Sequence, residues 1–383
     1  MPRIHWCGAG LSAVPGLRRL IAAGHSMTVW NRTLDRAKAA TAGLSGDFNH
    51  RVFDLGDLTA ALKPGDIAVS MLPGDWHPAI AKACLAAGAH FASSSYVSPE
   101  IRALGGAAED AGLVFVNEVG LDPGLDHMMA HDLVARYRES PAFDAANELS
   151  FYSYCGGLSE VPNEFRYKFS WSPLGVLKAL RSPSRSLRGG ETLDVARPWD
   201  AISAYELDLP GGAETFEVYP NRDSLPFIEE YGFDPAWRVK DFVRGTLRYG
   251  GWSDAWSDIF KEVEGLSGPE GEARLKEMSE EFWRLHAVKD GEADRVVLSV
   301  ELHAARGGKT VWAEGWRLDA IGGPEGSAMA RLVSIPLSLA IEAALDGEIA
   351  PGVSAAPANP ALVARFLAAA KEIAAHMERV ALS

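Results

Sequence analysis

Short apolar runs alternate with helical stretches over the first third of the chain. The apolar runs predict strands over residues 4–7, 27–30, 66–71, 90–93 and 113–116. The spacing of apolar positions between them predicts helices over residues 13–23, 78–87 and 99–111. Gly24, Gly88 and Gly112 follow these stretches, where glycine readily adopts the positive φ that ends a helix. The alternation predicts a mostly parallel sheet of βαβ units, although His5 interrupts a first strand that should be apolar on both faces.

The pattern changes after Pro123. Residues 148–154 alternate weakly between apolar and polar positions, and two alternating runs, 295–303 and 310–318, flank a Gly-Gly sequence at 307–308. Two such runs on either side of a short glycine turn predict an antiparallel hairpin. A second domain built on a mixed or antiparallel sheet is therefore expected.

Chain length and the C-terminal pattern set the expected domain boundaries. A chain of 383 residues suggests two or three domains. Residues 252–293, rich in Glu, Lys and Trp, are predicted to form a helical lobe on the second domain. Two alanine-rich stretches, 327–345 and 360–380, are predicted to be helices that pack back on the first domain. The expected boundaries are 1–123 with 326–383 for the first domain, and 124–325 for the second.

Composition narrows the class of protein. Hydrophobic residues make up 47% of the chain and charged residues 23%, as in soluble globular proteins. The net charge of −14 argues against a nucleic-acid partner, and no apolar run approaches the length of a membrane span. The N-terminus enters a strand at once, without the apolar region of a signal peptide. Cys7, Cys84 and Cys155 form neither a disulfide framework nor a zinc pattern, so we expect a cytoplasmic protein without a metal.

A glycine-rich sequence joins the first predicted strand to the first predicted helix. It reads Gly8-Ala9-Gly10-Leu11-Ser12-Ala13 and fits the G-x-G-x-x-A form of the dinucleotide fingerprint. The glycines permit a tight turn and close approach of a pyrophosphate, and the helix N-terminus supplies amide donors. The alternative is a plain glycine turn, but the strand–turn–helix context favours a dinucleotide. The expected fold class is therefore α/β, with a Rossmann-like, doubly wound parallel sheet and a second α+β domain.

The residues after the second predicted strand indicate which dinucleotide binds. NAD enzymes place an acidic residue about 20 residues beyond the fingerprint, but this chain has Asn31-Arg32-Thr33 there. No carboxylate repels a 2′-phosphate at this position, and Arg32 can grip one, so NADP is favoured over NAD. The alternative for Arg32 is a solvated surface arginine. Further cofactor contacts are expected where later strands end, at Asp54, Leu55 and Leu72.

The run from Asn117 to His127 combines turn formers, three carboxylates and a histidine directly after a predicted strand. Open α/β sheets bind ligands beyond the carboxyl ends of their strands, so this run predicts a ligand crevice. Four further strings accompany it: YCGGL at 154–158, YKFSWS at 167–172, YPNRD at 219–223 and RGTLRY at 244–249. With them the chain closely resembles the glutamate-forming, NADP-using saccharopine dehydrogenases over nearly its whole length. A shorter helical region after Trp252 and a divergent tail depart from the family.

This resemblance implies a reaction of lysine metabolism. The family links α-aminoadipate semialdehyde with glutamate by reducing their imine, and reverses this by oxidising the secondary amine of saccharopine. Saccharopine carries three carboxylates, and Arg222, Arg244 and Arg248 supply cations for them in an acidic chain. The alternative for each arginine is a surface ion pair. The resemblance also implies a homodimer, and substrate contacts at Tyr96, Ser98, Arg222, Arg244, Gly245 and Thr246.

The cofactor supplies hydride chemistry, so the protein must manage one proton on the substrate nitrogen. Candidates are Asp122, Tyr96, Cys155 and Lys168, of which Asp122 is the best placed; its alternative role is to cap the following helix. Cys155 is either a donor near the site or a small buried residue, and His127 is interpreted as structural. Additional cofactor contacts are expected at Ser95, Leu121, Asp122 and Trp171, although Trp171 is equally compatible with a core position.

Two other functions stay open at this point. Another C–N oxidoreductase of the same superfamily would join an amine or diamine to a semialdehyde, and a diamine would require carboxylates where Arg222 and Arg244 stand. A non-catalytic NADP-binding scaffold would keep the glycine turn and Arg32 but would not need Asp122 and Arg222.

Overall fold

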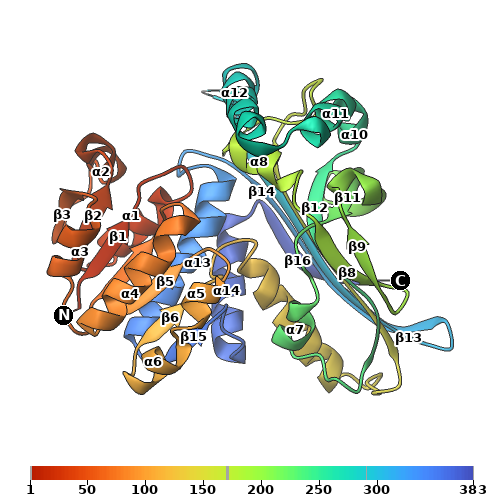
Figure 1. Cartoon of the computed structure of the whole chain (residues 1–383). Helices are drawn as coiled ribbons and strands as arrows, with labels where there is room; N and C mark the ends of the chain where they lie inside the picture. Colours follow the sequence, from red (N-terminus) through yellow and green to blue (C-terminus); the bar gives the residue numbers. More distant parts are fainter. Residues whose placement is uncertain (1, 170–171, 290, 383) are drawn as a thin grey trace. The chain divides into compact units, whose positions relative to one another are not determined.

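The computed structural model describes residues 2–169, 172–289 and 291–382 (Figure 1). The chain divides into two compact units. The first comprises Met1–Met128 and Pro324–Ile373, and the second comprises Met129–Gly323 and Ala374–Ser383. Each unit is built around one β-sheet.

A seven-stranded parallel sheet forms the centre of the first unit, in the strand order β15-β6-β5-β4-β1-β2-β3. The strands are β1 (Ile4–Cys7), β2 (Met27–Asn31), β3 (Phe48–Val52), β4 (Ile67–Ser70), β5 (His90–Ser93), β6 (Val114–Val116) and β15 (Gly352–Ser354). Strand β1 pairs with β2 on one side and with β4 on the other. The order therefore reverses at β1, and such a switch point opens a crevice beyond the carboxyl ends of the strands.

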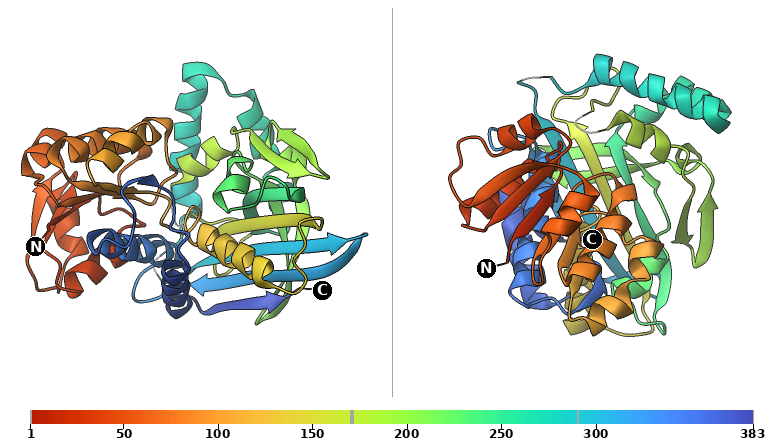
Figure 2. Two further views of the ribbon diagram at one scale, coloured as in Figure 1. Left: turned by 90° about the horizontal axis from the view of Figure 1, so that it is seen from below. Right: turned by 60° about the vertical axis from the view of Figure 1, so that its left-hand side comes forward.

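Helices cover both faces of this sheet (Figure 2). The helices of the first unit are α1 (Val14–Ala22), α2 (Leu34–Ala40), α3 (Leu55–Ala61), α4 (His77–Ala87), α5 (Pro99–Arg102), α6 (Gly105–Asp110), α13 (Ala328–Leu345) and α14 (Pro360–Ile373), and α7 (Leu125–Glu139) begins in this unit. Helices α1 and α13 can approach closely because Gly16 has no side chain. A Cβ at this position would lie 2.0 Å from the carbonyl oxygen of Ser334. The Gly16 amide also donates a hydrogen bond to Ser334 Oγ at 2.8 Å.

By length and composition, α13 is the one helix in the described part of the chain that could cross a membrane. However, 67% of this helix is buried inside the protein. Ser334 and Ser338 within it are fully buried and bond to carbonyl oxygens of their own helix. This is the pattern of a core helix.

Most of the first unit follows the predicted pattern. Strands β1 and β5 have the predicted limits, and Gly24, Gly88 and Gly112 have φ values of 89°, 68° and 69°. The buried His5 is accommodated by hydrogen bonds, since its ring lies 3.3 Å from Asp66 Oδ2 and accepts from Trp30 Nε1 at 3.2 Å. A polar residue in the first strand therefore does not disrupt a sheet buried on both faces.

The structure adds elements that the pattern did not predict. Strand β3 was missed because it has the sequence FNHRV and lies half exposed at the edge of the sheet. Helices α2 and α3 on either side of it are each only seven residues long. The predicted helix over 99–111 is two shorter helices, α5 and α6.

A nine-stranded mixed sheet forms the centre of the second unit. Its strands are β7 (Glu148–Ser159), β8 (Ser184–Arg188), β9 (Glu191–Val195), β10 (Ser203–Leu209), β11 (Gly212–Pro220), β12 (Arg238–Tyr249), β13 (Asp294–Arg306), β14 (Lys309–Ile321) and β16 (His376–Ala381). The main path is β10-β11-β12-β7-β13-β14-β16, and β8 joins β12 to β9. Strands β7 and β12 pair in parallel, while their other neighbours are antiparallel.

The predicted hairpin is confirmed, because β13 and β14 pair up to Arg306 and Lys309, with Gly307 and Gly308 in the turn at positive φ. The predicted lobe is helical, with α10 (Trp252–Ala255), α11 (Ser257–Gly265) and α12 (Gly268–His286). One prediction for the tail was wrong: the helix expected over 360–380 ends at Ile373, and β16 follows it. Strand β16 belongs to the second sheet because it pairs with β14, where buried Met377 lies opposite Leu318.

A network of polar side chains is buried on one face of the second sheet. Glu301 accepts hydrogen bonds from Tyr205, from Arg317 at 2.7 Å and from His303 at 2.9 Å. Arg317 also donates to Ser299 Oγ at 2.7 Å. Burial alone would raise the pKa of Glu301, but the hydrogen bonds and positive charge around it lower that pKa to about 2. The charged carboxylate therefore stabilises the folded second unit.

Acidification is expected to remove this stabilisation. An unfolded glutamate titrates near pH 4.3, so the contribution of Glu301 is complete above that pH and disappears as the pH falls toward 2. The difference in pKa corresponds to about 3 kcal/mol. Thermal unfolding measured between pH 6 and 2.5 should show a smaller acid-induced drop in Tm for Glu301→Gln than for the wild type. Equal drops would contradict this role for Glu301.

Candidate active site

The glycine turn between β1 and α1 has the geometry of a phosphate cradle. Gly8 has a φ of 110°, and a Cβ there would lie 2.7 Å from the carbonyl oxygen of Met71. No described atom lies within 4 Å of a Cβ placed on Gly10, so this part of the turn is open to a ligand. Ala13 is buried and has no polar side-chain atom that could cap α1. The open turn at a helix N-terminus fits a dinucleotide pyrophosphate.

Leu11 and Ser12, also predicted cofactor contacts, lie on the open side of this turn. The side chain of Leu11 is 59% exposed, and Ser12 is half-buried. An exposed leucine of this size beside a glycine turn is compatible with contact to a bound cofactor. Its contact with a cofactor stays a prediction.

Asn31 connects the glycine turn to the end of β2. Its Oδ1 accepts a hydrogen bond from the Ala9 amide at 3.1 Å, and its Nδ2 donates to the carbonyl oxygen of Thr33 at 3.0 Å. Asn31 is buried, whereas Arg32 and Thr33 are exposed beside it. The sequence predicted cofactor contact at all three positions, and the structure adds that Asn31 holds the turn in shape. Arg32 is left accessible to a 2′-phosphate.

Replacing Arg32 tests the predicted preference for NADP. Arg32→Ala is expected to raise the Kd for NADP about 10- to 100-fold, because a charge-assisted contact to phosphate contributes about 1.5–3 kcal/mol. The Kd for NAD should change much less, since NAD has no 2′-phosphate. Isothermal titration with both cofactors measures this difference, with Arg36→Ala on the exposed side of α2 as a matched control. Equal losses of affinity for NADP and NAD would rule out this role for Arg32.

The predicted contacts at Asp54, Leu55 and Leu72 also have local structural roles. Asp54 is exposed and caps α3, because its carboxylate accepts a hydrogen bond from the Asp57 amide at 3.0 Å. Leu55 and Leu72 are half-buried and pack against the hydrophobic core of the first unit. These residues stand where β3 and β4 end, as expected, and their contact with a cofactor stays a prediction.

Two of the three predicted catalytic residues lie together in the first unit. The hydroxyl of Tyr96 donates to Asp122 Oδ1 at 3.0 Å, and both side chains are half-buried. Asp122 belongs to a compact turn, in which a Cβ on Gly124 would lie 2.1 Å from the carbonyl oxygen of Gly120. Buried Leu121 is part of the same turn. The turn thus presents a carboxylate, hydrogen-bonded by a phenol, beyond the end of β6.

The loop that carries Tyr96 is held by hydrogen bonds on both sides. Ser95 Oγ lies 2.9 Å from His77 Nε2, and His77 Nδ1 lies 2.8 Å from Ser70 Oγ. Burial lowers the pKa of His77 to about 4, so this ring is neutral at neutral pH. Ser98 caps α5 by accepting from the Ile101 amide at 3.3 Å. Sequence reasoning missed His77, whose role depends on two serines from different strand ends.

Three predicted site residues cluster on neighbouring strands of the second unit. In the sheet register, Thr246 of β12 lies beside Tyr219 of β11 and beside Cys155 of β7. A Cβ on Gly245 would lie 2.4 Å from the Tyr219 carbonyl oxygen and 3.0 Å from the Tyr154 ring, so only glycine fits. Thr246 Oγ1 accepts a hydrogen bond from Asn221 at 2.8 Å, and Cys155 is half-buried.

The predicted arginines occupy three different environments. Arg244 is 2% exposed, and its guanidinium lies 4.0 Å above the Phe227 ring. Arg222 is exposed and has a φ of 56°. Arg248 is buried among the rings of Tyr167, Tyr219 and Trp252, at 4.9, 5.8 and 5.5 Å. Arg244 and Arg248 share one face of β12 with Thr246, because alternate residues of a strand point the same way.

Two other predicted residues are not placed at the site. Lys168 Nζ forms an ion pair with Glu292 at 2.6 Å, which is the simple alternative to a catalytic role. Trp171, predicted as a cofactor contact, lies outside the described residues. Within the ranges that the structure describes, no group of three or more His, Cys, Asp or Glu residues could hold a metal ion.

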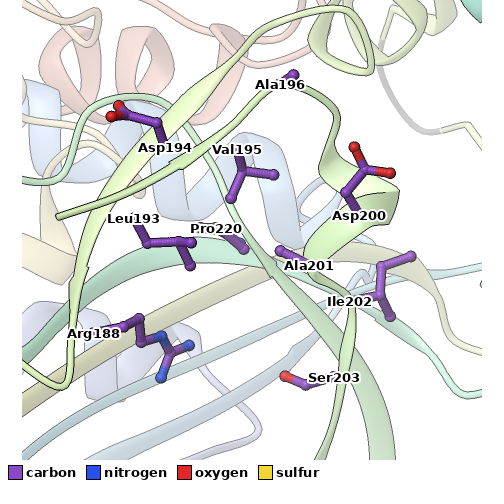
Figure 3. Close-up of a pocket in the computed structure, with 10 residues that line it drawn as sticks. All are labelled: Arg188, Leu193, Asp194, Val195, Ala196, Asp200, Ala201, Ile202, Ser203 and Pro220. Atoms are coloured by element: carbon purple, nitrogen blue, oxygen red, sulfur yellow. The ribbon is translucent and has the colours of Figure 1, made fainter. Parts of the chain in front are cut away.

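A separate pocket of about 670 Å³ opens beside β9 and the 3₁₀-helix Pro198–Ala201 of the second unit (Figure 3). Its lining includes Arg188, Asp194, Asp200 and Pro220. Because its charged lining has one arginine and two aspartates, this pocket suits an anionic ligand less well than the surroundings of Arg244 on β12. None of the predicted site residues lines this pocket.

The parallel sheet, the glycine turn at its switch point and the carboxylate beyond β6 are features of a dinucleotide-dependent oxidoreductase, and the exposed Arg32 after β2 favours NADP. Residues 4–116 match the family model described as the saccharopine dehydrogenase NADP binding domain. Residues 120–373 match the model of the saccharopine dehydrogenase C-terminal domain. The chain therefore belongs to the saccharopine dehydrogenase family, and its first unit carries the NADP-binding domain.

Curated relatives and solved structures agree with this assignment. The chain is 38% identical over 251 residues to saccharopine dehydrogenase [NADP(+), L-glutamate-forming] of Pyricularia oryzae, covering 64% of this chain and 54% of that protein. It is 38% identical over 208 residues to the mitochondrial alpha-aminoadipic semialdehyde synthase of Mus musculus, covering 53% of this chain and 22% of that protein. The chain thus spans about half the length of the fungal relative.

The apo saccharopine dehydrogenase (L-Glu forming) of Saccharomyces cerevisiae matches with a TM-score of 0.81 and 26% identity, over 100% of both chains. Homospermidine synthase of Legionella pneumophila matches with a TM-score of 0.62 and 13% identity, over 100% of this chain and 91% of that one. The second likeness shows a shared fold alone. The first extends across both units.

Proposed function

We propose that this chain is an NADP-dependent, glutamate-forming saccharopine dehydrogenase. It interconverts saccharopine, NADP+ and water with glutamate, α-aminoadipate semialdehyde, NADPH and a proton. The observation that carries the proposal is the likeness to the glutamate-forming enzyme of Saccharomyces cerevisiae over the full length of both chains. The buried Arg244 and the Tyr96–Asp122 pair support it, since they suit an acidic substrate with a secondary amine.

The chain's own residues bind and orient the substrate. When bound, NADP supplies the hydride acceptor for the ε-carbon of the lysine moiety, which is bonded to the secondary amine. Loss of that hydride and of the proton on nitrogen gives an imine, to which water adds before the C–N bond breaks. The carboxylate of Asp122, oriented by Tyr96, accepts the proton. Arg222, Arg244 and the Thr246 hydroxyl bind carboxylates of the substrate.

An amine or diamine dehydrogenase is the rival function. The fold shared with homospermidine synthase does not separate the two, because that likeness is 13% identical. The positive charge of the buried Arg244 supports saccharopine, because it suits a carboxylate better than a diamine. The test is the absorbance of reduced nicotinamide when the purified protein meets NADP with either saccharopine or a diamine. Reduction with the diamine alone would favour the rival.

We also propose that the enzyme is a homodimer in a reducing, cytoplasmic compartment. The three free cysteines, of which Cys7 and Cys84 are buried, suit a reducing environment. The dimer is supported by the family resemblance. Analytical ultracentrifugation tests it, and a single species at the mass of one chain would contradict it.

A further inference from the structure

Glu118 is a buried carboxylate at the end of β6 that the proposed reaction does not use. It is 4% exposed and has a φ of 57°, which is unusual for a residue with a side chain. Its Oε1 accepts a hydrogen bond from the Val97 amide at 2.8 Å. Its Oε2 lies 2.9 Å from Nε2 of buried His127, and its own amide donates to the Ser95 carbonyl oxygen at 3.1 Å.

These contacts join the two segments that carry the Tyr96–Asp122 pair. Val97 directly follows Tyr96 in the loop after β5. His127 lies in the first turn of α7, shortly after the turn that contains Asp122, and its neighbour Asp126 accepts from the Gly124 amide of that turn at 2.7 Å. One carboxylate thus fixes the loop on one side and the helix start on the other.

A glutamate at position 118 is energetically costly, which argues against a role in packing alone. A positive φ strains any side-chain-bearing residue, and a buried carboxylate loses its hydration. An apolar residue of similar volume often fills such a position at lower cost. Backbone strain of this kind gathers at functional sites, where the surrounding structure holds it in place.

We propose that Glu118 is a positioning residue that sets the distance and orientation of Tyr96 relative to Asp122. The kinetic consequence rests on the proposed function, while the geometric role rests on the hydrogen bonds of Glu118 alone. Catalytic groups must be held closely, since a misplacement of about 1 Å can lower the rate about 100-fold. Loss of Glu118 therefore lowers kcat more than it changes KM.

Asp66 is a matched control in the same unit. It is 6% exposed, and like Glu118 it accepts from backbone amides, those of Arg3 at 2.8 Å and Lys63 at 3.0 Å, and contacts a buried histidine, His5, at 3.3 Å. However, it precedes β4, at the amino end of the strands. Loss of Asp66 removes the same kinds of bonds without touching the Tyr96–Asp122 pair.

The test compares Glu118→Leu, Glu118→Gln and Asp66→Leu. Glu118→Leu is expected to lower kcat for saccharopine oxidation about 100-fold, with KM and the Kd for NADP changed less than about 3-fold. Glu118→Gln keeps an acceptor for the Val97 amide and should recover most of the lost kcat. Asp66→Leu should lower Tm comparably and leave kcat near the wild-type value. If Glu118→Leu does not fold, His127→Leu breaks the same connection from the helix side.

The results separate the proposed role of Glu118 from the proposed function. A kcat of Glu118→Leu (or His127→Leu) that matches that of Asp66→Leu would overturn the inference and leave the proposed function standing. If the wild type does not oxidise saccharopine, the proposed function fails, and hydrogen exchange decides the inference. Faster amide hydrogen exchange at both residues 95–98 and residues 119–124 in Glu118→Leu, but not in Asp66→Leu, supports the positioning role of Glu118. Unchanged exchange at residues 119–124 overturns it.

Discussion

Asp122→Asn is expected to lower kcat for saccharopine oxidation by about 10²- to 10⁴-fold, the usual contribution of a positioned general base. The substitution preserves shape and an acceptor for the Tyr96 hydroxyl, which donates to Asp122 at 3.0 Å. It removes the group that takes the proton from the substrate nitrogen. Because asparagine keeps the size and an acceptor oxygen of Asp122, the Kd for NADP should change much less than kcat.

Stopped-flow absorbance of reduced nicotinamide measures this effect on the chemical step. Tyr96→Phe provides the comparison, since it keeps the ring and removes the hydroxyl that donates to Asp122. It should have a smaller effect on kcat than Asp122→Asn. An Asp122→Asn enzyme within a few-fold of wild-type kcat would show that another group accepts the proton, and Cys155 would then be the next candidate.

Arg222→Ala is expected to lower kcat/KM for saccharopine about 10- to 100-fold, because a hydrogen bond to a charged group contributes about 1.5–3 kcal/mol. The effect should appear mainly in KM, since Arg222 binds a part of the substrate that does not react. Binding of NADP should be unchanged. Steady-state kinetics and isothermal titration measure the two quantities separately.

Arg185→Ala is the matched control for Arg222. Arg185 is a neighbouring surface arginine whose side chain forms ion pairs with Asp194 at 3.1 Å and Asp223 at 3.4 Å. Exposed pairs of this kind contribute little, so its loss should leave kcat/KM unchanged. If both variants have the same kcat/KM as the wild type, Arg222 does not bind the substrate.

The sequence predicted those elements whose residue pattern is local. The glycine turn, the buried strands β1 and β5 and the β13–β14 hairpin carry their own signals in turn residues and apolar periodicity. Strand β3, with the sequence FNHRV, carries no such signal, because an edge strand exposes polar residues to solvent. Strand β16 was mistaken for helix because its pairing partner, β14, lies about 60 residues earlier in the chain.

The roles of the site residues likewise depend on partners that are distant in the sequence. Asn31 and Ser98 were predicted as ligand contacts, and both also form hydrogen bonds that fix the backbone, because short polar side chains serve either purpose. Arg248 was grouped with the substrate arginines on sequence, yet it lies among aromatic rings that are far apart in the chain. The sequence assigned no individual role to Glu118 or His77, because their hydrogen-bond partners come from segments that only the fold brings together.

Product analysis tests the central claim most directly. The purified enzyme is incubated with saccharopine and NADP, and glutamate, lysine and reduced cofactor are quantified by chromatography and absorbance. The account predicts one glutamate for each NADP reduced, without lysine. Release of lysine with 2-oxoglutarate, or reduction of NADP without glutamate, would contradict it.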